Sequence, residues 1–427
     1  MSSDRAENVD QLRVVLDVRV SEAWGGVQQA AMGLAHGLSS LPGDGERYLF
    51  FAYKGELDWL GAHLGKNSEL VALERPGGLS RRVEEKLWSL GLPTSARLAS
   101  RAVHRRCERA AVGMMADVAH FTHQFPFHTT TRTIYQLHDL QHAHFPEFFS
   151  AAEVKRRDAI YADNCRRSDM IAVMSRWGRS DIVRQYGIEE GKVFVIPWAA
   201  PVQISHEPTL GDLYDIVSKY RLPQSFLLYP AQMWPHKNHL RLVRAVKAAH
   251  DHGCTDLNVV CTGRMGAEST GIMTEARRLS IADRVRFLGW VPPEAMIGVY
   301  RLSRGLIYPS LFEGWGMPLM EAFSVEVPVA CSRIPVLEEV AAEAAVYFDP
   351  YDIGDIADAI VSLWTDEGLR HRLVDHGQQR SQVLDWPTIA ETFRAHYRRL
   401  ANAPLTDRDR RLLTLSASGE WFGHREG

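Results

Sequence analysis

Short apolar runs alternate with longer amphipathic stretches along most of the chain. The first run, residues 12–20 (LRVVLDVRV), is rich in β-branched residues and nearly continuous, which is typical of a strand covered on both faces of its sheet. It is followed by Trp24, Gly25 and Gly26, and then by helical periodicity over residues 27–38. A strand, a glycine turn and a helix predict the opening of a β-α unit.

The same alternation continues to about residue 196. Helices are predicted between several of the strands, notably at residues 151–166 and 175–186. Further strands are predicted at residues 48–52, 70–73, 117–121, 133–137, 170–174 and 193–196. Strands that alternate with helices in this way favour an α/β domain with a doubly wound parallel sheet.

A second series of strands and helices follows a proline-bearing segment with little periodicity, residues 197–208. Its strands are predicted at residues 226–229, 257–262, 285–288, 306–308, 327–331 and 346–348. Its helices are predicted at residues 238–250, 268–279, 293–303, 317–325 and 353–364. We therefore expect two α/β domains, then a terminal helix and a frayed tail, with boundaries at residues 1–203, 204–385, 386–403 and 404–427.

The composition narrows the functional classes. Of the 427 residues, 45% are hydrophobic and 24% are charged, which supports large cores and excludes general disorder. The net charge is −3, so the whole chain lacks the electrostatic footprint of a nucleic-acid binder. No apolar run approaches the ~18 residues of a membrane helix, and the first ten residues have no signal-peptide core. The five cysteines never form a C-x-x-C pair, which favours reduced thiols in a cytoplasmic protein over a disulfide framework or a cysteine zinc site.

The segment at residues 309–321 (PSLFEGWGMPLME) carries the strongest chemical signal. Its loop holds Glu313 and two glycines, and a helix begins near Met317. Glycines let the backbone approach a ligand, and a helix N-terminus offers free N–H groups and the positive end of the dipole. Two glutamates eight residues apart are ordinarily two solvated positions. On a glycine-bearing strand-to-helix loop, Glu313 and Glu321 instead predict contacts to sugar hydroxyls along one ligand that also carries a phosphate.

A second candidate site follows the first strand of the second domain, at residues 229–239 (YPAQMWPHKNH). Lys237 is expected to open a helix there, where its ammonium could hold a diphosphate as a point charge. A surface lysine near a helix start is the alternative. Arg264, in the turn after the next strand, could supply a second positive charge or could be a solvated loop residue.

Two further loops are candidates in the first domain. Gly25 and Gly26 follow the first strand but do not form a G-x-G-x-x-G fingerprint, so the sequence gives little support for a dinucleotide site there. The alternative to a ligand-binding loop at these glycines is a plain tight turn. His138 ends a predicted strand and should therefore point toward the ligand-binding edge of the sheet. Six histidines crowd one window but show no compact metal-ligand spacing, so a metal site is disfavoured; they are His120, His123, His128, His138, His142 and His144.

Residues 75–109 are strongly basic, with nine Lys and Arg side chains against three Glu. Such a surface could approach anionic lipid or a charged acceptor, and a solvated helical face is an equal alternative.

The sequence resembles the retaining glycosyltransferases of family 4, which have the GT-B architecture of two Rossmann-like domains facing a cleft. FEGWGMPLMEA looks like that family's E-x₇-E signature, and residues 331–350 are similar to the segment that follows it. The resemblance implies an N-terminal acceptor domain, a C-terminal nucleotide-sugar domain and a C-terminal helix that crosses back.

The resemblance also implies roles for individual residues. Glu321 would bind the ribose, Glu313 and His138 the transferred sugar, and Lys237 the diphosphate. Backbone groups would contribute as well, at Gly25, Gly26, Val291, Gly314, Trp315, Gly316, Met317 and Pro318. The chain departs from the family at Ala231 and Gln232, where many members carry an arginine before the lysine. This departure leaves the second cationic contact open, with Arg264 as one candidate.

We therefore expect a metal-independent, cofactor-free retaining glycosyltransferase, cytoplasmic or peripheral on the inner membrane face through residues 75–109. GDP-mannose is the first expectation for the donor, because the PAQMWPHKNH stretch looks most like mannosyl-transferring members. The acceptor would be a saccharide or a lipid-linked saccharide. Two alternatives stay open: a UDP- or dTDP-sugar enzyme acting on a small natural product, and a non-catalytic sugar-binding scaffold. Retention could use an enzyme nucleophile or same-face attack, and the lack of a convincing nucleophile favours the latter.

Overall fold

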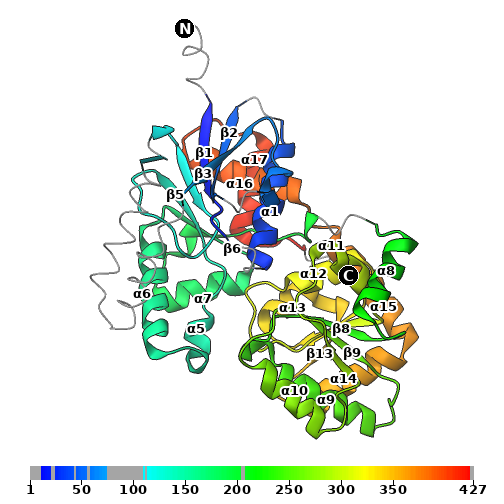
Figure 1. Cartoon of the computed structure of the whole chain (residues 1–427). Coiled ribbons are helices and arrows are strands. Elements are labelled where there is room, and N and C mark those ends of the chain that lie inside the picture. The colour runs from blue at the N-terminus through cyan, green and yellow to red at the C-terminus, as the bar shows by residue number, and fades with distance from the viewer. Residues whose placement is uncertain are drawn as a thin grey trace. The chain divides into compact units, whose positions relative to one another are not determined.

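The computed structural model describes residues 11–20, 25–42, 45–54, 58–74, 109–110, 113–202 and 207–423. The chain forms two compact units (Figure 1). Unit 1 consists of Met1–Trp198 together with Asp385–Gly427, and unit 2 of Ala199–Leu384. The second unit thus begins at residue 199, where the sequence analysis expected residue 204.

Unit 1 is built on a seven-stranded sheet in the order β3-β2-β1-β4-β5-β6-β7, in which every neighbouring pair is parallel. Its strands are β1 (Leu12–Asp17), β2 (Glu46–Tyr53), β3 (Ser68–Leu73), β4 (Val118–Phe121), β5 (Arg132–Gln136), β6 (Met170–Val173) and β7 (Val193–Val195). Within the described residues, its α-helices are α1 (Gly26–Ser40), α2 (Asp58–Gly61), α5 (Gln141–His144), α6 (Ala151–Arg167), α7 (Arg176–Tyr186), α16 (Trp386–Leu400) and α17 (Asp407–Ser418).

Unit 2 is built on a six-stranded parallel sheet in the order β10-β9-β8-β11-β12-β13. Its strands are β8 (Leu227–Pro230), β9 (Val259–Thr262), β10 (Val285–Phe287), β11 (Gly305–Tyr308), β12 (Val329–Ser332) and β13 (Ala345–Phe348). Its α-helices are α8 (Leu210–Tyr220), α9 (His239–Asp251), α10 (Ser269–Arg278), α11 (Pro293–Leu302), α12 (Met317–Ser324), α13 (Pro335–Ala341), α14 (Ile353–Thr365) and α15 (Glu367–Ser381). Short 3₁₀ turns precede α9 (η5, Pro235–Lys237) and β13 (η6, Ala342–Ala344).

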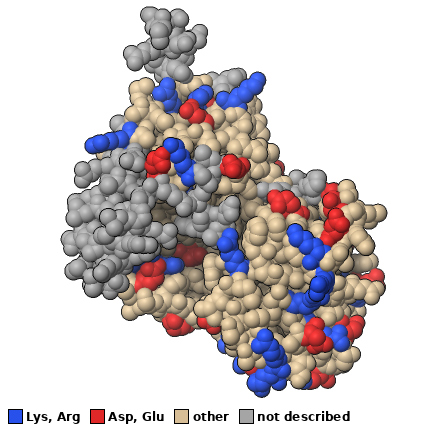
Figure 2. All heavy atoms as spheres, in the orientation of Figure 1, with Lys and Arg blue, Asp and Glu red and all other residues tan. Residues whose placement is uncertain are grey.

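All strands predicted from the sequence are present, with ends that shift by a few residues, and both sheets are doubly wound. Their central strands are fully buried, as in β11 and β12, because helices cover parallel sheets on both faces. Most charged side chains are at least partly exposed, and the buried exceptions in unit 1 include Asp17, Glu46 and Asp409. Figure 2 shows Lys and Arg interspersed with Asp and Glu over the visible face of unit 2, without the single-sign patch of a nucleic-acid surface.

The C-terminal segment returns to unit 1, as predicted, and α16 packs along α1 (Figure 1). Two glycines of α1 make this close approach possible. A Cβ atom at Gly33 would lie 1.9 Å from Cε2 of Trp386, and one at Gly37 would lie 2.4 Å from the Trp386 carbonyl oxygen. Gly33 and Gly37 therefore form a notch, which the first residue of α16 fills.

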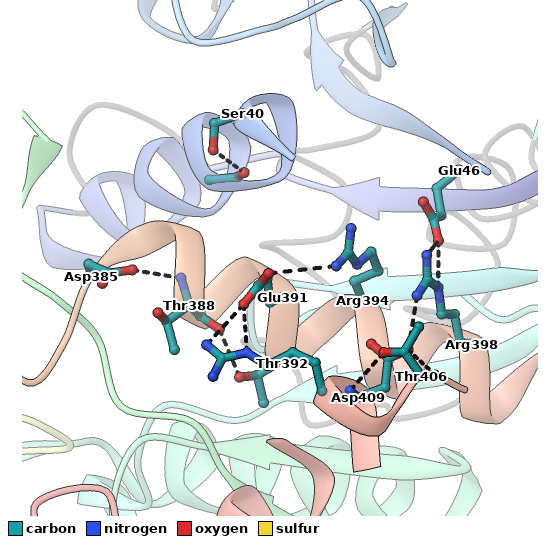
Figure 3. Close-up of polar contacts among 12 residues, drawn as sticks. Ser40, Glu46, Asp385, Thr388, Glu391, Thr392, Arg394, Arg398, Thr406 and Asp409 are labelled. Carbon is teal, nitrogen blue, oxygen red and sulfur yellow. Dashed lines mark hydrogen bonds and ion pairs between the residues drawn. The ribbon is translucent and has the colours of Figure 1, made fainter. Parts of the chain in front are cut away.

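The prediction of a frayed tail from residue 404 is wrong for residues 407–418, which form α17. Its first turn has a capping box: the Thr406 hydroxyl accepts from the Asp409 amide at 3.1 Å, and the Asp409 carboxylate accepts from the Thr406 amide at 2.8 Å. The helix packs on α16 and β7 (Figure 3 shows its start). The helix was not predicted because most of its positions are charged or polar. Its buried face includes Leu412 and Ser416, which lie one turn apart.

Unit 1 buries several histidines, among them His120, His138 and His396. Burial lowers the pKa of His120 to about 3, of His138 to about 4 and of His396 to about 3. Their rings sit among aromatic side chains: His120 Nδ1 lies 2.8 Å from the Tyr397 hydroxyl, and the His396 ring stacks on Phe194 with centroids 3.7 Å apart. All three imidazoles are therefore neutral in the folded protein at physiological pH.

Mild acid should destabilise unit 1. An unfolded histidine titrates near pH 6.5, so between pH 6.5 and pH 4 the unfolded chain binds protons that the folded chain does not. The stabilisation is complete above pH 6.5 and is lost as the pH falls, by on the order of 1 kcal/mol per pH unit for each histidine. Thermal unfolding followed from pH 7.5 to pH 5 measures this effect. A midpoint that stays constant over the range would contradict it, and His396→Gln should flatten the pH dependence.

Candidate functional site

The candidate site of unit 2 lies at the carboxyl ends of its strands. The chain winds outward in one direction from β8 to β10 and in the other from β11 to β13, so β8 and β11 flank the point at which the strand order reverses. In open α/β sheets the loops leaving such strands separate and form the ligand-binding crevice. Lys237 follows β8, and Glu313 follows β11.

These two loops bring Lys237 and Glu313 together. Lys237 Nζ lies 2.5 Å from Glu313 Oε1, and the side chains are only 13% and 11% exposed. The sequence pattern predicted that Lys237 opens a helix. This prediction is wrong, because Lys237 ends the 3₁₀ turn η5. Asn238 then takes a left-handed conformation (φ 62°) before α9 begins at His239. The turn places the ammonium beside the sheet edge instead of along a helix surface.

Two buried tyrosines support this ion pair. Lys237 Nζ donates to the Tyr308 hydroxyl at 3.3 Å, and the Tyr229 hydroxyl donates to the Lys237 carbonyl. The two phenol rings meet edge to face, with centroids 5.8 Å apart. Burial and the Glu313 charge raise the pKa of Tyr308 well above its ordinary value, so it is neutral. Sequence reasoning missed both tyrosines, because buried residues at strand ends have no distinctive pattern.

The loops around the ion pair are joined by backbone contacts. Asn238 Nδ2 donates to the carbonyls of Pro309, at 3.0 Å, and Pro350, at 2.8 Å. The Leu311 amide donates to the His236 carbonyl at 2.8 Å. These bonds fix the loops after β8, β11 and β13 to one another, which preorganises the charged pair before any ligand binds.

The loop from Glu313 to α12 presents backbone more than side chains. Trp315 and Met317 are buried, so at these predicted positions a ligand would meet the main chain. Gly316 is the N-terminal cap of α12 with φ 114°, and a Cβ there would lie 2.8 Å from Leu337 Cδ2. Gly314 and Pro318 are partly exposed. The first turn of α12 therefore begins in a conformation that glycine allows and other residues resist.

Glu321 lies in the second turn of α12 and is held by a third tyrosine. The Tyr300 hydroxyl, from α11, donates to Glu321 Oε2 at 2.5 Å. Burial raises the pKa of the Glu321 carboxyl, and the hydrogen bond from Tyr300 opposes this increase. Glu313 and Glu321 thus lie on one loop-helix segment, with Lys237 paired to the first. Their match to the paired glutamates of a family signature stays a prediction.

Arg264 and Val291 occupy the loops after β9 and β10, which are joined to the β8 loop. The Met233 amide donates to the Arg264 carbonyl at 3.4 Å, and the Gly263 amide donates to the Gly289 carbonyl at 2.8 Å. Gly263, with φ 114°, lets the loops touch, since a Cβ there would lie 2.4 Å from the Ala231 carbonyl oxygen. The Arg264 side chain is exposed, whereas Val291 is 5% exposed and can offer mainly its backbone.

The remaining predicted residues belong to unit 1. Gly25 precedes α1 with φ 50°, and Gly26 is the first residue of that helix, on the loop after β1. His138 lies two residues beyond β5 and is 7% exposed. Its Nε2 lies 2.9 Å from the Thr122 carbonyl; because the ring is neutral, this nitrogen donates and Nδ1 is an acceptor. The Trp198 ring packs edge-on against His138, with centroids 5.1 Å apart.

The histidine-rich window has structural contacts. His144 Nε2 lies 2.7 Å from Asp181, and the buried His142 ring packs against Tyr161. Within the residues that the structure describes, no group of three or more His, Cys, Asp or Glu side chains is placed to hold a metal ion. The basic segment at residues 75–109 lies outside the described residues, apart from Arg109. No helix in the described part of the chain is both long and apolar enough to span a bilayer.

Comparison with known families identifies the domain that carries this geometry. Residues 216–380 match the family model for glycosyl transferases group 1, and this region includes Lys237, Glu313 and Glu321. The chain carries a group 1 glycosyltransferase domain. The glycosyltransferase class predicted from the sequence is thereby confirmed.

The similar curated proteins include mannosyltransferases. The glycosyltransferase is 26% identical over 291 residues to O-antigen chain mannosyltransferase B of Escherichia coli, covering 67% of this chain and 76% of that protein. It is 27% identical over 216 residues to O-antigen chain mannosyltransferase RfbU of Salmonella typhimurium, covering 51% and 56% of the two chains.

Solved structures confirm the fold. A sucrose-phosphate synthase from Thermosynechococcus elongatus superposes with a TM-score of 0.72 at 18% identity, covering 92% of this chain and 100% of that one. WaaG, a glycosyltransferase involved in lipopolysaccharide biosynthesis, superposes with a TM-score of 0.64 at 14% identity, covering 91% and 99%. The glycosyltransferase therefore has the predicted GT-B architecture of two Rossmann-like domains.

Proposed function

We propose that this glycosyltransferase transfers mannose from GDP-mannose to a saccharide or lipid-linked saccharide, with retention at the anomeric carbon. The observation that carries the proposal is the Lys237–Glu313 pair at the switch point of the unit 2 sheet. A cation suits a departing diphosphate there, and a carboxylate beside it suits the hydroxyls of the sugar. The mannosyltransferase relatives favour mannose as that sugar.

The other residues take the following roles in this proposal. Glu321 accepts hydrogen bonds from the ribose, and the Val291 backbone contacts the base. Arg264 supplies a second positive charge, since the stretch before Lys237 reads Ala231-Gln232 and carries no arginine. In unit 1, Gly25 and Gly26 offer backbone amides to the diphosphate, and His138 offers Nδ1 as an acceptor to the sugar.

Catalysis requires stabilisation of the diphosphate that leaves while positive charge develops on the sugar. Lys237 and the amides at the start of α12 act on that leaving charge, so the proposed enzyme needs no metal or cofactor. We propose same-face attack, in which Glu313 positions the sugar and the departing phosphate takes the acceptor proton. We also propose that the enzyme meets its acceptor on the cytoplasmic side of the membrane.

Calorimetry with a panel of nucleotides tests the proposal. GDP, GDP-mannose, UDP, UDP-glucose and dTDP are titrated into the protein with a chelator present. We expect GDP and GDP-mannose to bind selectively, and Glu321→Ala to weaken them about tenfold or more. Glu294→Ala, an exposed position on α11, should bind like the wild type. Selective binding of UDP or dTDP would be consistent with a glycosyltransferase but would reject GDP-mannose as its donor. If none of the nucleotides binds, the proposed donor site is wrong.

A further inference from the structure

The two glutamates of the candidate site are held by different kinds of partner. Glu313 is paired with the cation of Lys237. Glu321 accepts a hydrogen bond from the neutral Tyr300, and in the described part of the chain that hydroxyl is its sole polar partner. The Tyr300 side chain is 1% exposed and fully enclosed, whereas Glu321 is partly exposed.

The Tyr300 contact joins two neighbouring elements of the site. Tyr300 lies in the last turn of α11, which follows the loop that carries Val291, and Glu321 lies on α12, which follows the loop that carries Glu313. The end of α11 is fixed in turn, because the amide and the hydroxyl of Ser303 both donate to the Tyr300 carbonyl, at 2.9 and 2.7 Å. Because the ring is buried, its hydroxyl oxygen stays beside Glu321 Oε2, and the hydrogen bond holds that carboxylate oxygen in place.

A neutral donor has a consequence that a cation would not have. An ammonium or guanidinium on Glu321 would neutralise the carboxylate and compete with any ligand that donates to it. The Tyr300 hydroxyl occupies Oε2 while leaving the negative charge of the group and the lone pairs of Oε1 for a ligand. The arrangement suits an acceptor for two adjacent sugar hydroxyls.

We propose that Tyr300 is a positioning residue for ribose recognition, which acts by fixing the Glu321 carboxylate for the hydroxyls of the nucleotide. The inference rests on the proposed function, since it takes the ligand of Glu321 to be a nucleotide. It adds a residue that lies outside the glycine-bearing loop and that contacts no substrate itself.

Tyr300 also affects the charge of the group that it holds. Burial raises the pKa of Glu321 and the Tyr300 hydrogen bond lowers it; within the described residues no charged side chain pairs with this carboxylate. Tyr300 itself stays protonated, because burial and the Glu321 charge raise its pKa well above the ordinary value. Without the hydroxyl, the carboxyl would take up a proton at a higher pH, and a protonated Glu321 binds ribose less well.

The test is Tyr300→Phe, with Tyr347→Phe as a matched control in the same unit, since the Tyr347 hydroxyl donates only to the Ala342 carbonyl, at 2.6 Å. Calorimetry from pH 5.5 to pH 8.5 uses the nucleoside diphosphate that the wild type binds best and, in parallel, inorganic pyrophosphate, which has no ribose. We expect Tyr300→Phe to bind the nucleotide about three- to tenfold more weakly at pH 7, and to lose affinity at a higher pH than the wild type as the pH falls. Pyrophosphate binding should not change.

Combination with Glu321→Gln completes the test. If Tyr300 acts through Glu321, Tyr300→Phe should have little further effect on nucleotide binding in a Glu321→Gln background. If Tyr300→Phe binds the nucleotide as tightly as Tyr347→Phe does, the inference is overturned and the proposed function is unaffected. Equal weakening of nucleotide and pyrophosphate, or an unchanged pH profile, would show that the loss is structural and would also overturn it. A wild type that binds no nucleotide would overturn both proposals.

Discussion

Replacing Lys237 with methionine should reduce glycosyl transfer by about 10²- to 10³-fold, the magnitude typical of losing a group that stabilises charge in the transition state. Lys237 is the cation that the structure places at the switch point of the unit 2 sheet, paired at 2.5 Å with Glu313 and hydrogen-bonded to Tyr308. If Lys237 holds the diphosphate, removal of its charge weakens diphosphate binding and slows departure of the diphosphate from the sugar. Initial rates of transfer measure the effect on departure, and the affinity for the nucleoside diphosphate, determined on the same preparation, measures the effect on binding.

Two further variants separate chemistry from folding. Lys247→Met removes a partly exposed lysine of α9, which pairs with Asp251 one turn away, and should leave the rate unchanged. Lys237→Met leaves Glu313 without its cation and thereby costs stability, so the double variant with Glu313→Gln should recover the melting temperature without recovering transfer. Transfer by Lys237→Met within a few-fold of the wild type would show that the charge is not needed at this position.

Replacing Arg398 with methionine should destabilise unit 1 by about 3–5 kcal/mol, because it leaves two buried carboxylates without their cation. Arg398, on α16, donates to Glu46 Oε1 from Nε at 2.6 Å and to Asp409 Oδ2 from Nη1 at 2.9 Å (Figure 3). Glu46 and Asp409 are 4% and 0% exposed. The guanidinium thus joins the start of β2, α16 and the capping box of α17, and methionine preserves most of its apolar stem.

Thermal unfolding measures this loss, which corresponds to a decrease of roughly 10 °C in the midpoint for a unit of this size. The control is Arg408→Met. That arginine pairs with Glu391 at 3.1 Å but is 49% exposed, so its removal should cost less than about 1 kcal/mol. A midpoint for Arg398→Met within 2 °C of the Arg408→Met midpoint would mean that the two carboxylates are stabilised by other groups.

The architecture was predictable because its signal is local. Each buried strand is a short apolar run such as residues 305–308, and the strands are separated by helices or by turns rich in glycine and proline. Helices that were not predicted from the sequence, such as α13 and α15, lack that signal. In α15 (EGLRHRLVDHGQQRS) only Leu373 and Gly377 are buried, and Gly377 packs against Phe323 where a longer side chain would clash. A glycine that permits close packing is indistinguishable in sequence from one that ends a helix.

The candidate site was predictable only in part, for a related reason. Lys237, Glu313 and Glu321 stand on loops whose glycines and position after a strand mark them in the sequence. Tyr308 and Tyr300 act through hydrogen bonds to residues that are distant in the chain, 71 and 21 positions away, and such pairings leave no periodic trace. Likewise, the burial of His138 and its neutral state follow from how Trp198 and Thr122 pack around it.

The discontinuity of unit 1 determines the order in which the protein can be completed on the ribosome. Unit 2 is one uninterrupted stretch and can fold as soon as it has emerged, whereas the sheet of unit 1 is synthesised first but waits for the segment that begins at Asp385. Until then the notch at Gly33 and Gly37 lacks Trp386, and β7 lacks the hydrogen bond that Trp421 Nε1 donates to the Val195 carbonyl at 2.8 Å. A nascent chain released before residue 385 would therefore hold a finished unit 2 tethered to an unfinished unit 1, with apolar surface open to chaperones and proteases.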